Sequence, residues 1–234
     1  MSYAAGFAQG LKTGATSVFA AVIFATYVGY GALCHDLGFS LLWSLFSTVI
    51  VWAGPAQVIL VTTLGAGAPL PEVAVAVSLS AMRFLPMVAA LLPMIKTPAT
   101  RVWNLLLPAH FTAASMWVEG MRVAPTLPRE GRVAFCNGLG TTMMLCACGG
   151  SILGFALAAR LPPLLAAVVL FITPLSFLMS LARNARELID RLALVLGLII
   201  TPVLMYEQVG LALLVGGLIA GTISYVAHRV RRGR

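Results

Sequence analysis

The sequence predicts an all-α polytopic membrane protein with about eight spans, and its composition and long apolar runs lead to that fold class. Of the 234 residues, 60% are hydrophobic and 9% are charged, whereas a soluble globular domain carries about 25% charged residues. A membrane-spanning helix needs about 20 mostly apolar positions, so eight spans leave about 70 residues for all the loops. No soluble ATPase, ectodomain or DNA-binding domain fits into so little chain, and we treat residues 1–234 as a single transmembrane domain.

Eight apolar runs mark the expected spans. They cover residues 13–34, 40–64, 73–95, 102–118, 133–158, 161–181, 189–206 and 208–228. The first run is too long for a signal peptide and no cleavage site follows it, so we expect it to remain as a span. The fourth run is the weakest, because Asn104, Pro108 and His110 interrupt it. The four cysteines lack the spacing of a metal or haem motif, and we interpret them as packing residues.

Lysine and arginine are unevenly distributed between the two sides that eight spans define. With a cytoplasmic N-terminus, three of the 15 basic residues lie outside, at Lys96, Arg101 and Arg160, while Arg83 lies within a span. The other eleven lie inside: Lys12, Arg122, Arg129, Arg132, Arg183, Arg186, Arg191, Arg229, Arg231, Arg232 and Arg234. Cytoplasmic loops of membrane proteins carry such an excess of basic residues. We therefore expect both termini in the cytoplasm, and we attribute the net charge of +8 to membrane orientation rather than to nucleic-acid binding.

The chain also contains a faint internal repeat. Residues 40–95 pass from a glycine-broken run through a proline-bearing turn to a proline-interrupted run, and residues 133–181 repeat that order. The two units lie three spans apart, so they would be inverted relative to each other, as in many secondary transporters. Chance similarity between apolar segments is the alternative.

The string from Trp52 to Gln57 is the most informative motif, because it places Gly54 and Pro55 in the middle of an apolar run. Proline removes a helix hydrogen bond and glycine loosens the backbone, so we expect the span to break there. The second half-helix would then present free N–H groups at its positive end, which suits a substrate carboxylate. Gln57 would add a neutral donor and acceptor. A simple proline kink packed against a neighbouring helix is the alternative.

Arg83 lies near the middle of the third run, where a guanidinium costs about 2.5–3.5 kcal/mol on insertion scales. No Asp or Glu lies near the middle of any run, since Asp190 is at the very start of the seventh. An anionic ligand group or backbone carbonyls would therefore balance Arg83, unless its side chain snorkels to an interface. His110 would either carry a proton or form a hydrogen bond within the bundle. Asn137 would line a polar path with nearby Thr and Ser residues, or hydrogen-bond to a neighbouring helix.

Enzyme motifs are missing from the sequence. It has no Walker A string, no Gly-x-Ser-x-Gly elbow and no His-Glu-x-x-His motif. We therefore expect neither a catalytic residue nor a cofactor or bound metal.

Several motifs together resemble the AzlC family, the large subunits of bacterial branched-chain amino acid exporters. They are Leu37-Gly-Phe-Ser40, Ser44-Leu-Phe, Ala53-Gly-Pro-Ala-Gln57, Ala66-Gly67 and Arg83. The chain departs from the family pattern at Ala109-His110, where members often carry an acidic pair, and around Arg83, which Met82 and Phe84 flank. The resemblance implies a location in the bacterial inner membrane and a small AzlD-like partner subunit of about four spans.

These observations predict a secondary transporter that exports leucine, isoleucine, valine or similar amino acids across the lipid bilayer, with a higher oligomer as a further expectation. The predicted substrate-binding residues are Gly54, Pro55, Gln57, Arg83, His110 and Asn137. A channel or exporter for another small organic solute is the first alternative. A membrane enzyme or cofactor-binding subunit is the second.

Overall fold

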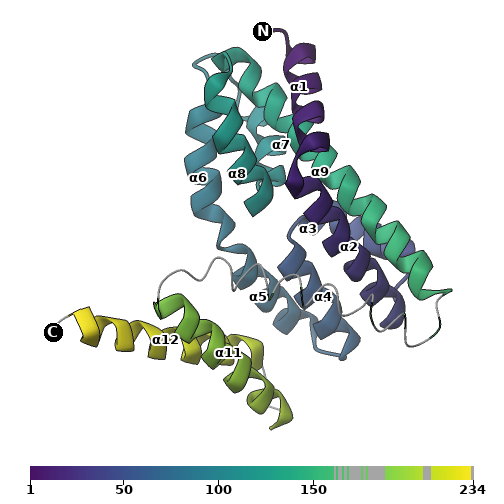
Figure 1. The fold of residues 1–234 in the computed structure, drawn as a ribbon, viewed down its shortest axis with the longest axis vertical. Helices are drawn as coiled ribbons and strands as arrows, with labels where there is room; N and C mark the ends of the chain where they lie inside the picture. Colours follow the sequence, from purple (N-terminus) through teal and green to yellow (C-terminus); the bar gives the residue numbers. More distant parts are fainter. Residues whose placement is uncertain are drawn as a thin grey trace.

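The computed structural model describes residues 1–160, 188–207 and 212–232, together with the isolated positions 162, 165, 168, 175 and 178. All elements within these residues are helical, which confirms the predicted all-α class (Figure 1). Among the described residues, those long and apolar enough to cross a membrane are α2 (Val18–Asp36), α9 (Arg129–Ala158) and Ile189–Tyr206 of α11 (Leu188–Tyr206). The bent pair α5 (Leu70–Ala81) and α6 (Phe84–Ile95) makes a fourth candidate. The eight predicted spans are therefore not confirmed.

Two long parallel rods form the frame of the fold. Helix α1 (Tyr3–Thr16) continues into α2, and together they lie along α9 in the same direction (Figure 1). Gly10 packs against the backbone of Phe135 at one level, and Gly31 packs against the backbone of Ser151 further along. Small residues allow helix backbones to approach this closely, which is how membrane helices associate when no hydrophobic driving force acts between them.

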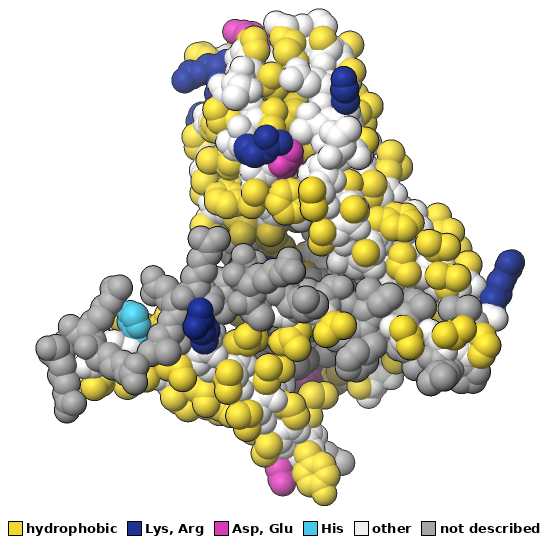
Figure 2. All heavy atoms as spheres, in the orientation of Figure 1, with side chains coloured by type: hydrophobic (Ala, Val, Ile, Leu, Met, Phe, Trp, Pro, Cys, Tyr) yellow, Lys and Arg dark blue, Asp and Glu magenta, His cyan; other side chains and the backbone are white. Residues whose placement is uncertain are grey.

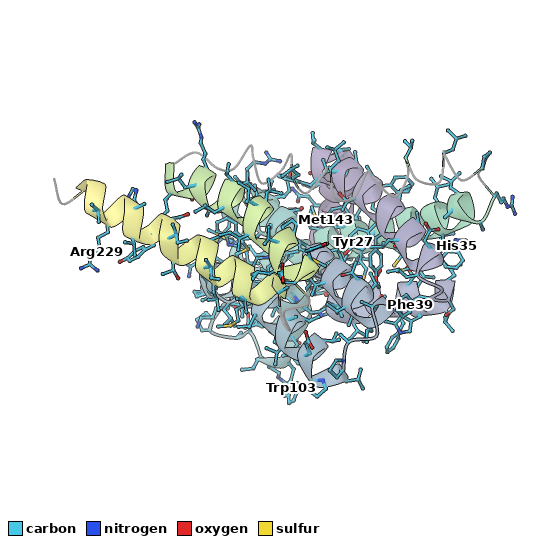
Figure 3. The ribbon with its side chains drawn as sticks, turned by 90° about the horizontal axis from the view of Figure 1, so that it is seen from below. Tyr27, His35, Phe39, Trp103, Met143 and Arg229 are labelled. Carbon is cyan, nitrogen blue, oxygen red and sulfur yellow. The ribbon has the colours of Figure 1, made fainter. Side chains whose placement is uncertain are left out.

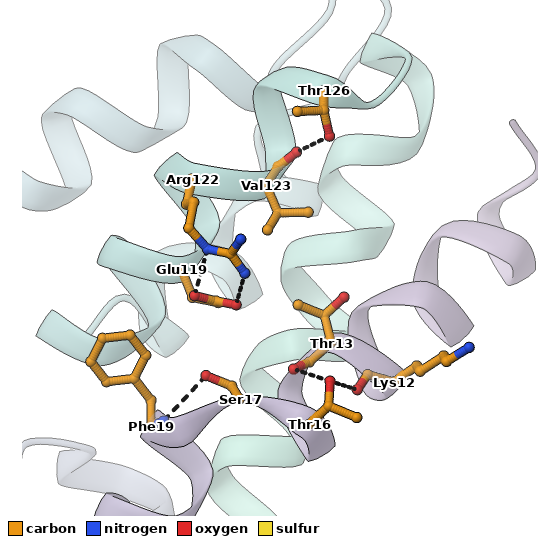
Figure 4. Close-up of polar contacts among 9 residues, drawn as sticks. All are labelled: Lys12, Thr13, Thr16, Ser17, Phe19, Glu119, Arg122, Val123 and Thr126. Carbon is orange, nitrogen blue, oxygen red and sulfur yellow. Dashed lines mark hydrogen bonds and ion pairs between the residues drawn. The ribbon is translucent and has the colours of Figure 1, made fainter.

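The sequence did not predict α1 as a separate helix. The first apolar run begins at residue 13, but the chain is already helical from Tyr3, and the helix is interrupted at Ser17. Ser17 has an extended backbone, and its hydroxyl accepts a hydrogen bond from the amide of Phe19 as the N-cap of α2 (Figure 4). A serine in this role satisfies one of the free amides at a helix start. The glycines of α1 lowered its apolar content, so hydropathy alone did not reveal the helix.

The second apolar run folds back on itself. It forms α3 (Leu41–Val51) and α4 (Gly54–Gly65), separated at Trp52 and Ala53 as the sequence predicts. A straight helix over these residues would be about 36 Å long. Instead, Gly65 at the end of α4 packs against Leu37, just before the start of α3. The pair therefore enters and leaves at the same end of the molecule, and we refer to α3 and α4 as the first hairpin.

The fourth run also folds back, which corrects the prediction that residues 102–118 form a span. It forms α7 (Trp103–Phe111) and α8 (Ala114–Val123), with a break at Thr112 and Ala113, and we call this pair the second hairpin. Trp103 lines the same cavity as Arg129, while the end of α8 leads through a 3-10 turn (Ala124–Thr126) directly into α9. Both ends of the second hairpin therefore lie beside the start of α9. Pro108, and the loss of helical hydrogen bonds at Thr112, allow the chain to reverse.

This correction changes the distribution of charge. Arg132 donates hydrogen bonds to the carbonyls of Met94 and Pro125, which joins the end of α6 to the start of α9. Lys96 and Arg101, predicted on the outer side, therefore lie at the same end as Arg122, Arg129 and Arg132. Arg160 follows α9 at the other end. Over residues 1–160, the basic residues are therefore divided more unequally between the two ends than the predicted alternating spans would divide them.

Helices α5 and α6 connect the two ends. Helix α5 begins shortly after Gly65, and α6 ends beside Arg132, so the pair crosses the molecule with a 48° bend between its halves. Arg83 lies at this bend. The predicted third run is therefore an interrupted crossing element.

The last two described helices pack against each other. Gly216 of α12 (Ala212–Arg232) contacts Thr201 of α11. Most of residues 161–181 lies outside the described residues, so the inverted repeat stays a prediction. One difference is visible: Gly149 and Gly150 lie within the continuous helix α9, whereas the corresponding point of the first unit is broken at Trp52.

Hydrophobic side chains cover most of the described surface on the face shown in Figure 2. Leu42 on α3 is 78% exposed and Phe46 is 64% exposed. Soluble monomers rarely expose apolar patches of this extent. The surface is that of a membrane protein, in agreement with the composition.

The closeness of α1 and α9 predicts a strong position dependence for Gly→Ala changes. A Cβ on Gly138 would overlap the carbonyl oxygen of Phe7, whereas a Cβ on Gly149 would meet its nearest neighbour, in Phe24, at 3.6 Å. Gly138→Ala should therefore lower the free energy of unfolding by about 1–3 kcal/mol, the usual cost of overpacking. Gly149→Ala is the matched control and should change it little. Unfolding in a denaturing detergent titration measures both, and equal stabilities would contradict the close contact.

The hairpin topology is testable by labelling single cysteines in a background lacking the native four. Cysteines at Ala99 and Thr126 should react with a membrane-impermeant maleimide from one side of the membrane, because both lie at the α9-start end. A cysteine at Gly67, beyond the first hairpin, should react from the opposite side. Labelling of residues 99 and 126 from opposite sides would restore the fourth span.

Candidate functional site

The two hairpins meet at their tips, and each supplies the hydrogen bond that the other lacks. The indole Nε1–H of Trp52 donates to the carbonyl of Phe111 at 2.9 Å, where α7 ends. The Nε2–H of His110 donates to the carbonyl of Val49 at 2.8 Å, in the last turn of α3. A helix end leaves carbonyls without intrahelical partners, and inside a membrane no water replaces them. The Trp52 bond is buried and the His110 bond lies at the exposed surface of the molecule, and each satisfies a carbonyl at a helix end.

Trp52 holds an unusual backbone conformation at this meeting point. It is the one non-glycine residue with a positive φ among the described residues, at φ 38° and ψ 45°. Such a conformation costs of order 1–3 kcal/mol and persists only where its surroundings fix it. The indole stacks on the ring of Tyr27 at 6.4 Å between centroids and meets the ring of Phe111 edge-on at 6.5 Å. Phe111 itself packs against Gly140, near the middle of α9.

Gln57 anchors the first hairpin to α2. Its side chain is fully buried. The Tyr27 hydroxyl donates to Gln57 Oε1, and Gln57 Nε2 donates to the Thr48 hydroxyl at 3.1 Å. Thr48 in turn donates to the carbonyl of Ser44. One side chain therefore joins α2, α3 and α4, and buried polar networks of this kind fix a single arrangement when their members are satisfied.

The start of α4 has the predicted form. Gly54 is its first residue, Pro55 follows, and Ala53 before them provides no side-chain cap. Because a proline has no N–H, the first turn loses one of its free donors. The remaining amides at this helix start lie beside the Gln57 network, half-buried within the molecule.

Arg83 lies at the bend between α5 and α6, with its side chain exposed. Its Cζ is 4.9 Å from the centroid of the Phe84 ring, a cation–π contact. No carboxylate among the described residues forms an ion pair with it. The described contacts do not connect Arg83 with Gln57 or with the start of α4.

Of the two remaining predicted residues, His110 lies at the hairpin tips and Asn137 lies elsewhere. The hydrogen bond from His110 to Val49 agrees with the structural alternative for this histidine. Asn137 is buried on α9 near its start, where its amide Nδ2 donates to the hydroxyl of Tyr3 at 3.0 Å. The structure thus gathers Gly54, Pro55, Gln57 and His110 around the hairpin tips, and separates Asn137 from them.

The AzlC protein family matches residues 18–161 of this chain. The chain belongs to the AzlC family. This match confirms the resemblance to the AzlC family that the sequence motifs indicate. The family is associated with membrane transport of amino acids. No curated protein and no solved structure gives a significant match.

The matched region of this AzlC chain contains the structural features described above. It covers both hairpins, the interrupted crossing element and α9, while α1, α11 and α12 lie outside it. The family match and the hairpin tips therefore coincide in one part of the chain.

Sequence reasoning missed two residues of this arrangement. Tyr27 and Phe111 are ordinary aromatic residues within apolar runs, and nothing in their local sequence indicates a polar contact. Tyr27 and Met143 are both buried in the core, in contrast to Trp103 at the outer edge of the fold (Figure 3). Trp52 did carry a signal, since a tryptophan two residues before a glycine–proline break within an apolar run must satisfy its N–H within the membrane.

The Trp52 hydrogen bond predicts a specific loss of stability. Trp52→Phe keeps an aromatic ring in contact with Tyr27 and Phe111 but leaves the Phe111 carbonyl without the indole donor. The free energy of unfolding should fall by about 1–3 kcal/mol. Trp103→Phe is the matched control, because Trp103 is 79% exposed. Equal losses in the two variants, measured by detergent unfolding, would contradict the proposed role of the indole.

Proposed function

We propose that this AzlC chain is the large membrane subunit of an exporter of branched-chain amino acids in the bacterial inner membrane, working as a secondary transporter. Family membership supports amino-acid transport as the class of function. The observation that carries the proposal is the meeting of two opposed hairpins near the middle of α9 through the side chains of Trp52 and His110. Half-helices that end within a membrane protein are typical binding elements of secondary transporters.

The substrate carboxylate, in this proposal, approaches the start of α4 and the guanidinium of Arg83. A zwitterion entering the membrane needs compensation for its carboxylate, because an unpaired charge there costs several kcal/mol. Gly54 and Pro55 begin a helix without a side-chain cap, and Arg83 has no described carboxylate partner. Gln57 positions this helix start through Tyr27 and Thr48.

Separation of the hairpin tips would open a path past this point. The direct side-chain bonds between the two tips are those of Trp52 and His110, so parting them requires no helix to unfold. His110 would then exchange its hydrogen bond to the Val49 carbonyl for one to water or to the substrate. The proposal thus gives His110 a role in holding the tips closed.

We further propose that the end of the molecule beside the start of α9 faces the cytoplasm. Five basic residues from the loops and helix ends of residues 1–160 gather there: Lys96, Arg101, Arg122, Arg129 and Arg132. Their number supports this orientation, because cytoplasmic loops are enriched in such residues. In this proposed orientation the N-terminus is on the cytoplasmic side, as the sequence predicts. We expect the C-terminus on the same side.

The proposed partner is a small AzlD-like membrane subunit. The broad apolar surface over α3 and the exposed small residues of α12 support helix contacts within the bilayer. A higher oligomer of such complexes is consistent with the same surfaces. The expected result is that leucine efflux from liposomes needs both subunits.

Arg83→Lys tests the carboxylate contact. Lysine keeps the charge but loses the planar two-pronged donor that matches a carboxylate. Leucine efflux from preloaded cells that also express the small partner should fall by about tenfold or more, through a loss of substrate stabilisation. Expression level and melting temperature should match those of the parent protein.

Arg101→Lys is the matched control, since Arg101 is an exposed arginine outside the proposed site. Efflux by this variant should remain within about twofold of the parent, as expected for a charge that stays solvated. Undiminished efflux by Arg83→Lys would assign Arg83 a structural role and place the carboxylate elsewhere.

A further inference from the structure

A cavity of about 590 Å³ lies at the α9-start end of the molecule, away from the hairpin tips. Its volume is within the range of small-molecule sites, about 300–1,000 Å³. The loop between α6 and α7, the first turns of α7 and the first turns of α9 form its walls, and Tyr3 of α1 completes it. Neither the hairpin tips nor Arg83 contributes to it.

One buried polar atom in this cavity lacks a partner. The side chain of Asn137 is 4% exposed and lines the cavity, and its Oδ1 has no hydrogen-bond partner. Its Nδ2 is already used by the Tyr3 hydroxyl. Leaving a buried acceptor unsatisfied costs about 1–3 kcal/mol. Oδ1 itself is closed off from the cavity, so a ligand donor reaches it, and recovers that free energy, once the Asn137 side chain turns toward the cavity. An ammonium group is such a donor.

The polar groups at the mouth of the cavity have both signs. Arg129 and Glu130, in the first turn of α9, both line it, and neither forms an ion pair with another described residue. Pro128, the residue before α9, gives the helix no side-chain cap, so the positive end of α9 is also directed to this region. The Tyr3 hydroxyl accepts from Asn137 and keeps its own hydrogen for donation. Arg129 and the start of α9 therefore stabilise a carboxylate in the cavity, and Glu130 stabilises an ammonium group.

The rest of the cavity wall is mostly apolar, with Asn104 as a further polar side chain. Ala99, Trp103, Leu107 and Val133 contribute apolar surface. Thr97 and Thr100 hydrogen-bond to each other at 2.8 Å between their hydroxyl oxygens, so they place little demand on a ligand. A ligand that fits this lining carries a carboxylate and an ammonium group close together, and it has a small apolar side chain.

We propose that this cavity is a loading site for a zwitterionic amino acid with an aliphatic side chain. Arg129 and the start of α9 bind the α-carboxylate, while Glu130 and Asn137 Oδ1 accept hydrogen bonds from the α-ammonium group. The inference rests on the proposed export function, in which this end faces the cytoplasm, where an exporter must capture its substrate. The cavity holds the substrate before it reaches the hairpin tips.

Binding of L-leucine to the purified full chain in nanodiscs tests the site, with equilibrium dialysis of radiolabelled leucine as the measurement. Arg129→Gln and Glu130→Gln should each raise the Kd by about tenfold, the effect of losing one charged hydrogen-bonding partner. Arg101→Gln, at the same end but outside the cavity lining, is the matched control and should leave the Kd within about twofold. Leucinamide, without the carboxylate, and 4-methylpentanoate, without the ammonium, should both compete poorly.

Trp103 provides a local signal. Leucine should change the tryptophan fluorescence of the parent protein, and Trp103→Phe, which keeps an aromatic ring in the lining, should abolish most of that change. The Arg129 and Glu130 variants decide the question without changing the buried Asn137, because both residues are exposed. Equal Kd values for Arg129→Gln and Arg101→Gln, or a fluorescence change that survives Trp103→Phe, would overturn the loading site.

The two proposals fail in different ways. Leucine efflux that is insensitive to Arg129→Gln and Glu130→Gln, with unchanged Kd, removes the loading site and leaves the export function standing. Saturable binding in the cavity without efflux, in the presence of the partner subunit, supports the cavity as a leucine site and removes the export function.

Discussion

Carbonyl groups at interrupted helix ends are the constraint on which this structure depends. A membrane interior offers them no water, so each must find a donor within the protein. Here α3 and α7 stop near the middle of α9, and the indole of Trp52 and the imidazole of His110 supply donors across the junction. The bonds are reciprocal: each hairpin donates to the carbonyl of the other. Without the other hairpin, each helix would end at this depth with an unpaired carbonyl, which would raise the free energy of the folded protein.

A rigid frame is needed to hold the two tips at bonding distance. The paired rods of α1–α2 and α9 provide it, because their glycines allow backbone contact over nearly the whole length of both rods. Phe111 packs against Gly140 of one rod, and Trp52 stacks on Tyr27 of the other. The Gln57 network then fixes the first hairpin to α2. The frame, the tips and the network therefore form one connected interior.

Polar groups are distributed along the axis of this interior rather than in one pocket. The cavity with Asn137 lies at the α9-start end, and the start of α4 lies beside the hairpin tips. Charged residues are concentrated at the ends. Arg122 illustrates this: near the end of α8 it donates to the buried carboxylate of Glu119, and this hydrogen bond raises the pKa of the guanidinium (Figure 4).

The sequence by itself determined the all-α membrane class, the break at Gly54 and Pro55, and the family, because apolar content and proline chemistry are local properties. It also placed Arg83 near the middle of an apolar run, and the structure then put a bend there. Only the tertiary structure decided that the second and fourth runs return to the side they came from, since a hydropathy run has a length but no direction. The glycine-rich α1, with polar residues on either side of its small ones, escaped detection for a related reason: its stability comes from contact with α9 and not from its own apolar character. Likewise the partners of Trp52, Gln57 and Asn137 are Phe111, Tyr27 and Tyr3, at separations of 30 to 134 residues. Hydrogen bonds between distant segments leave no trace in local sequence, and they, rather than the apolar runs, place the functional groups.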